Sequence, residues 1–148
     1  MPSTAGCGLW RDNMNTIDLS DLELVRAVEA CELPNDSFHH RDHIRLAWIY
    51  LQRYGEVEAR RHMADAIRKF AAYHGKSDKY HETITIAWVW FVANAIAQLP
   101  RHATFADLTT AAPELLDKRT IEKFYSAAAL ESKTARISWI EPDLQPLP

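Results

Sequence analysis

The sequence predicts an all-α protein, built as an up-down-up-down helical bundle with an additional N-terminal helix. The composition supports this class, since 47% of the 148 residues are apolar and only 4 glycines and 7 prolines occur, too few for a collagen-like or turn-rich all-β chain. Residues 83–90 are rich in β-branched and aromatic side chains but lack the turn residues and alternation of a strand. A chain of this length can bury one core, so we expect a flexible leader at 1–15, a single domain at 16–141 and an extended tail at 142–148.

The additional N-terminal helix is indicated by apolar residues at helical spacing. Asp18 or Ser20 can cap its start by accepting hydrogen bonds from the first free amide groups. We expect it to end at Leu33, because the residue before a proline disfavours the α-helical region. Its apolar positions are Leu19, Leu22, Val25 and Val28.

A glycine follows each of the second and third predicted helices. Asp36 or Ser37 can cap the second helix, whose apolar stripe runs from His40 to Tyr54. Gly55 is expected to end it, and a third helix should run from Glu56 to His74, before a further glycine. Such short connections favour antiparallel neighbours.

The fourth predicted helix, from about Asp78 to Gln98, is apolar on more than one face. A helix of this kind must be surrounded by other elements, so we expect it at the centre of the bundle. Thr104 and Asp107 predict a short capped helix, and Pro113 or Asp117 can start a last one. The apolar positions of that last helix are Ile121, Phe124, Tyr125, Ala128 and Leu130.

Charge and cysteine content limit the expected partners and location. The 17 basic and 20 acidic residues give a net charge of -3, which provides no general attraction to nucleic acid or to an anionic membrane. The opening residues lack the charged and apolar regions of a secretion signal. Cys7 and Cys31 form no disulfide or metal-binding pattern, so we expect reduced thiols and a cytoplasmic location. A small-molecule ligand is the expected partner, with a homodimer as a further possibility.

Histidines are concentrated at three predicted helix ends. If the helices alternate in direction, the starts of the second and fourth and the end of the third meet at one end of the bundle. These ends carry a run at 39–43, His74, and the pair His81 and Glu82. We therefore expect five of the seven histidines to converge there.

The helical phase indicates which of these side chains point inward. His40 and His43 share the apolar side of their helix, whereas His39 lies nearer its flank and Asp42 faces away. His81 follows the apolar side of the fourth helix. Glu82 shares a direction with a second apolar face, where a carboxylate is costly to bury without a cation, a proton or a metal.

These donors predict a divalent transition-metal site. Imidazole nitrogens and a carboxylate suit Zn, Fe, Mn or Ni, and helical bundles build such sites between facing helices. An open coordination position would allow metal-dependent hydrolysis or the oxygen chemistry of a non-haem iron enzyme. His39 and His74 are the candidate catalytic residues for proton transfer, because imidazole titrates near neutral pH. The expected metal ligands are His40, His43, His81 and Glu82.

The same residues can also be explained without catalysis. His74 can interact with the carbonyl groups at a helix end, and Glu82 can form a salt bridge without chemical function. Its candidate partners are Arg41, Arg45 and Arg136. The histidine-rich end can also be a non-catalytic pocket for a small anion, favoured by helix N-termini and Arg41, or part of a homodimer without chemistry.

Four short strings carry a resemblance to a known family: FHHRDH at 38–43, KYHET at 79–83, YS at 125–126 and PDL at 142–144. The chain resembles a family of small uncharacterised bacterial helical proteins over most of its length from Phe38 onward. The resemblance implies a free-standing soluble bacterial protein and supplies no activity. DinB-type metalloproteins and HD-type phosphohydrolases are more loosely similar, and their histidine patterns differ from those here.

Overall fold

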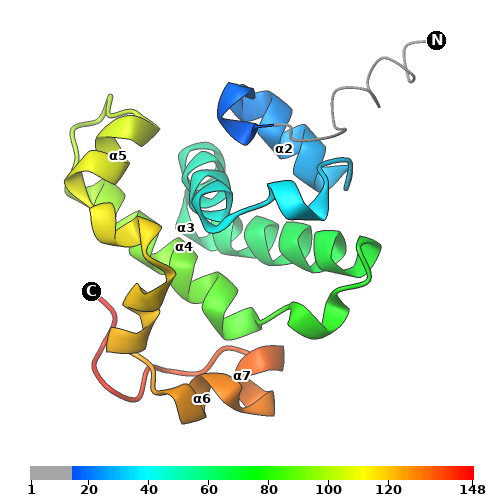
Figure 1. Ribbon diagram of the computed structural model, residues 1–148. Helices are drawn as coiled ribbons and strands as arrows, with labels where there is room; N and C mark the ends of the chain where they lie inside the picture. Colours follow the sequence, from blue (N-terminus) through cyan, green and yellow to red (C-terminus); the bar gives the residue numbers. More distant parts are fainter. Residues whose placement is uncertain (1–14) are drawn as a thin grey trace.

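Two long helices, α3 (His40–Tyr73) and α4 (Glu82–Ala97), pack against each other at the centre of the computed structural model (Figure 1). The structure describes residues 15–148, so the predicted leader lies outside the described residues except for Asn15. All regular elements in this described range are helical, which confirms the all-α class. No helix within it has the length and hydropathy needed to cross a membrane.

Helix α2 (Asp21–Glu29) is the predicted additional N-terminal helix, and it packs on α3. Ser20, one of the two residues expected to cap it, forms a capping box with Glu23. The helix ends four residues before Leu33, however. Cys31 adopts a left-handed conformation with φ 59°, and the amides of Cys31 and Glu32 bond back to the carbonyls of Val28 and Ala27. These features end the helix before the chain reaches the proline.

Helix α3 contains both the second and the third predicted helices. It begins at His40, because the carboxylate of Asp42 accepts a hydrogen bond from the amide of His39. Asp42 is buried and also bonds to the hydroxyl of Thr16, so the prediction that it faces away is wrong. The preceding residues that we expected to cap this helix form a separate 3-10 turn, Asn35–Ser37.

Gly55 interrupts α3, with φ 77° and ψ 175°. This conformation is accessible almost only to glycine, so the predicted break is present although hydrogen-bonded helix continues on both sides. In Figure 1 the first half of α3 is viewed nearly end-on, while the second half runs across the view. The strict up-down-up-down order of the bundle therefore stays a prediction. The end of α3 at Tyr73, before Gly75 with φ 68°, agrees with the sequence.

Helix α4 is the central helix that the sequence predicts, with buried residues on several sides. It begins at Glu82 rather than near Asp78. Ser77–Lys79 forms a separate 3-10 turn, and His81 has the extended backbone of an N-cap residue, with φ -139°. The side chain of His81 is therefore oriented by the cap and not by helical periodicity.

The C-terminal third contains several short helices instead of one long one. Thr104 and Asp107 form the predicted capping box of α5 (Phe105–Ala111). The predicted last helix is replaced by the 3-10 segments η4 (Pro113–Leu116) and η5 (Lys118–Lys123) and by α6 (Ala127–Glu131) and α7 (Lys133–Ile137). A new helical segment begins after each of three N-cap residues, which are Asp117, Ser126 and Ser132.

Partly buried hydrogen bonds attach this C-terminal region to the core. The hydroxyl of Thr83 on α4 donates to the carbonyl of Ser138 at 2.8 Å and accepts from the amide of Ile140 at 3.2 Å. The buried Tyr125 donates to the carbonyl of Ile140 at 2.8 Å. Residues 142–148 contain no helix, and the amide of Leu144 bonds to the carbonyl of Phe124.

Candidate functional site

A cavity of about 430 Å³ lies between α3, α4, the 3-10 turn before α4 and η5. Its volume is in the range of small-molecule sites. Its polar wall is formed by His40, His43, Lys79, Tyr80, His81, Thr85 and Lys118. Its apolar wall is formed by Met63, Ile67, Ile84, Trp88 and Ile121. Three of the four expected metal ligands thus line a single cavity.

His40 contributes its ring from the first turn of α3. Its Nε2 lies 2.9 Å from the carbonyl oxygen of Leu115. Because the carbonyl can only accept, Nε2 carries the proton and Nδ1 keeps its lone pair. The ring packs edge-on against Trp88, with ring centres 4.5 Å apart. Burial lowers the pKa of His40, the ammonium of Lys118 also lowers it, and the Leu115 carbonyl and Asp117 act against this shift.

His43 lies one helical turn further along the same face of α3. Its ring stacks on Phe38, with centres 4.0 Å apart and planes inclined by 10°. Burial, followed by the neighbouring His40, lowers the pKa of His43 to about 4. Its imidazole is therefore neutral at pH 7 and presents a flat, uncharged wall.

His81 is buried and holds the start of α4. Its Nδ1 accepts a hydrogen bond from the amide of Ile84, at 3.2 Å, and its Nε2 donates to the carbonyl of Leu130, at 2.6 Å. Both ring nitrogens are engaged, which fixes the tautomer. Burial lowers the pKa of His81 despite the Leu130 carbonyl, and Arg136 lowers it further. Metal coordination here would require one of these two bonds to open.

Glu82 does not line the cavity. Its Oε1 accepts from Arg68 at 3.0 Å and from the hydroxyl of Tyr80 at 2.5 Å. The guanidinium of Arg68 lies over the Tyr80 ring, 5.0 Å from its centre. The sequence-based reading that Glu82 forms a salt bridge therefore describes its contacts, but the partner comes from the second half of α3 and is none of the three arginines expected.

The two candidate catalytic histidines lie apart from the cavity. The side chain of His39 is 74% exposed and lines a different groove, together with Arg41 and Arg45. His74 caps the end of α3 and packs against Phe70. Its buried Nε2 has no hydrogen-bond partner within residues 15–148.

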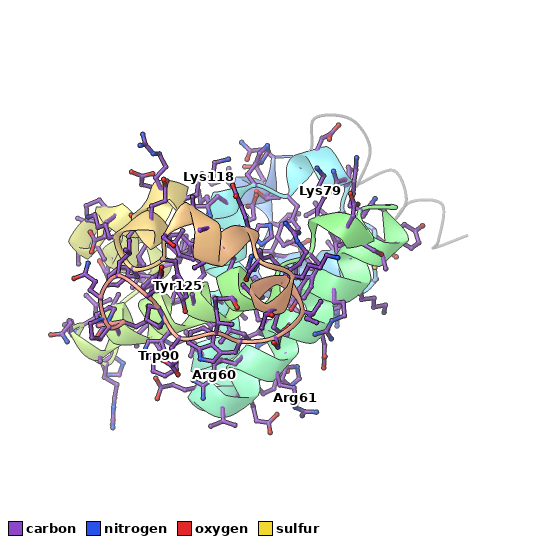
Figure 2. The ribbon with its side chains drawn as sticks, turned by 90° about the horizontal axis from the view of Figure 1, so that it is seen from below. Arg60, Arg61, Lys79, Trp90, Lys118 and Tyr125 are labelled. Atoms are coloured by element: carbon purple, nitrogen blue, oxygen red, sulfur yellow. The ribbon has the colours of Figure 1, made fainter. Side chains whose placement is uncertain are left out.

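The charge around the cavity comes from two lysines that were not among the expected site residues. Of the described side chains that line it, none is a carboxylate, while Lys79 and Lys118 are exposed at its edge. Figure 2 shows the two lysines on the same side of the molecule, away from Arg60 and Arg61. Lys79 directly precedes the Tyr80-His81 pair, and this adjacency in the sequence could have indicated that Lys79 lies near the site. Lys118 comes from a segment whose position depends on the tertiary fold.

The donor set can be compared with what a metal needs. In the part of the chain that the structure describes, no group of three or more His, Cys, Asp and Glu side chains is arranged to hold a metal ion. Nearby, His40 and His43 offer neutral imidazoles, His81 is engaged with backbone groups, and Glu82 is paired with Arg68. The arrangement as it stands offers neutral rings, two cations and apolar walls.

Comparisons with known proteins add no relative to this description. The scan against family models matched none, and the searches of curated proteins and of solved structures also returned no match. The residues of the site are therefore the only available indication of function.

Proposed function

We propose that the protein binds a small organic anion with an apolar body in the cavity between α3, α4 and η5. One observation carries this proposal: the cavity combines two lysines and neutral rings with apolar walls, and no described residue lining it is acidic. Ligand sites are typically apolar with a few polar groups that fix orientation. A carboxylate or similar group would lie near the lysines at the edge, with its apolar part inside.

The neutral histidines leave the charge of the cavity to its lysines. With their pKa values lowered, His40, His43 and His81 contribute hydrogen-bonding rings and no charge at pH 7. The lysine ammonium groups then supply the charge complementarity, as compact donors suited to carboxylate or phosphate. The negative groups nearby are already engaged: Glu82 bonds to Arg68 and Tyr80, and Asp117 caps η5.

Octanoate, octanol and octylamine test the charge requirement, because they share a chain length and differ in the head group. Isothermal titration calorimetry should detect octanoate binding, weaker octanol binding and no octylamine binding. Lys118→Met keeps the length of the side chain and removes its charge. We expect it to weaken octanoate binding about tenfold, which corresponds to about 1.4 kcal/mol.

Lys123→Met is the matched control, since Lys123 belongs to the same 3-10 segment but does not line the cavity. It should leave octanoate binding unchanged. Equal binding of octanoate and octylamine, or an unchanged affinity in Lys118→Met, would overturn the proposal.

A transition-metal site is the second candidate, and the shared cavity of His40, His43 and His81 favours it. His40 and His43 would supply ring nitrogens one helical turn apart, with His81 as a third donor once its bond to Leu130 opened. Hydrolysis or oxygen chemistry would depend on that ion. The test is the melting temperature of untagged protein with Zn, Fe, Mn or Ni, which a bound metal should raise in the wild type but not in His40→Ala.

A chelator separates the two candidates. Octanoate binding that survives EDTA treatment supports the anion site, whereas binding that disappears and returns with metal supports the metal site. We propose a cytoplasmic location for this binding, supported by Cys31, which is a free thiol. The bacterial origin rests on the family resemblance alone.

A further inference from the structure

A second cavity, of about 390 Å³, lies beside the first. The two cavities have four wall residues in common: His43, Ile67, Lys79 and Tyr80. Lys79 and Tyr80 precede α4, whereas His43 and Ile67 belong to the two halves of α3. Because the same side chains border both spaces, the two cavities adjoin each other along this shared wall.

The second cavity repeats the charge pattern of the first. It adds Lys76, which is exposed in the connection after α3. Lys76 lines only the second cavity, Lys118 lines only the first, and Lys79 lines both. The described residues around the second cavity include no carboxylate either. Each cavity therefore has a cation of its own.

The walls near the shared residues are apolar. Phe38 and Phe70 line the second cavity with their rings 4.9 Å apart in an edge-on arrangement, and the shared Ile67 is buried. Phe38 also stacks on His43, whose neutral ring borders both spaces. Lys79 is the one described cation that borders both cavities, and it is exposed. Away from Lys79, a charged group in this middle region would lose its hydration without a partner, so the middle of a ligand should be apolar.

We propose that the ligand is an elongated organic dianion, with an acidic group at each end and an apolar middle, that occupies both cavities. This inference rests on the proposed function and specifies its ligand class. One acidic end lies near Lys118, the other near Lys76, and Lys79 is between them. The two acidic ends are recognised by separate lysines, so a substitution of one lysine should remove the recognition of one end and leave that of the other end intact.

A series of straight-chain dicarboxylates, from adipate to sebacate, tests this by calorimetry against octanoate. The best dicarboxylate should bind at least tenfold more tightly than octanoate. Lys76→Met should weaken that dicarboxylate about tenfold and leave octanoate unchanged, while Lys118→Met should weaken both. Lys133→Met, at an exposed position on α7 that lines neither cavity, is the control and should change neither affinity.

Failure of this inference can be distinguished from failure of the proposed function. If octanoate binds with dependence on Lys118, but no dicarboxylate binds more tightly or Lys76→Met has no effect on any of them, the dianion is wrong and the anion site stands. If neither octanoate nor any dicarboxylate binds, both are wrong. Melting curves without ligand show whether each variant is folded.

Discussion

Acid should destabilise the protein through His43, before its carboxylates protonate. The folded structure lowers the pKa of His43 from 6.5 to about 4, whereas the ring regains its ordinary pKa when the chain unfolds. Between these values the unfolded state binds more protons than the folded state, so stability falls as the pH falls. The full difference corresponds to roughly 3 kcal/mol, at about 1.36 kcal/mol per pKa unit, and about 2 kcal/mol of it should already be lost at pH 5.

The assay is urea unfolding of the wild type and of His43→Phe at intervals between pH 7.5 and 4.5. Phenylalanine keeps a flat ring against Phe38 but has no proton site. The free energy of unfolding of the variant should fall less on acidification than that of the wild type, by about 2 kcal/mol at pH 5. His102→Gln is the control for removal of an exposed imidazole. Parallel curves for the wild type and His43→Phe would refute the reasoning.

Two substitutions test the backbone and the attachment of the C-terminal region. Gly55→Ala should destabilise the protein by about 1–3 kcal/mol through backbone strain alone, since an added Cβ would meet no atom within 4 Å. Gly75→Asn, at φ 68°, should cost less stability. Equal losses of stability for the two variants in thermal unfolding would contradict this. Thr83→Val should cost about 2 kcal/mol or more because it leaves the two backbone groups that Thr83 bonds unpaired. Thr109→Val, whose exposed hydroxyl bonds within its own helix, should be nearly neutral in the same urea assay.

Local signals were sufficient to predict several element boundaries. The capping boxes that begin with Ser20 and Thr104 involve residues three positions apart, so the sequence contains the whole interaction. Gly55 and Gly75 were predicted to end helices, and both have the positive φ that favours glycine. These features need no information about distant parts of the chain.

Boundaries that depend on single residues in unusual environments were not predicted. Cys31 ends α2 in a conformation for which glycine is the usual signal, so the sequence pointed instead to the later proline. Asp42 was expected to face away, but Thr16 and the amide of His39 hold it in the interior. Apolar spacing after Pro113 suggested one helix, although capping residues divide that region.

The candidate site shows the same division between periodic and non-periodic segments. His40 and His43 lie within α3, where a 3.6-residue period applies, and both line the cavity. His81 and Glu82 were both treated as helical positions, on two different apolar faces of the fourth helix. Because His81 is the N-cap, hydrogen bonds set its orientation, and Glu82 faces Arg68. Lys118 enters the site only through the packing of η5, which no local pattern encodes.

The bond from His81 to the Leu130 carbonyl has a consequence for biosynthesis. A ribosome makes the chain from its N-terminus, so α3 and α4 emerge well before Lys118 and Ile121 complete the cavity wall and before Leu130 bonds to His81. A partly synthesised chain therefore has no finished cavity. A ligand that requires the complete cavity would stabilise only chains in which the segments after α4 have packed against α3 and α4. Its presence in the cell would therefore stabilise full-length, folded molecules over incomplete ones.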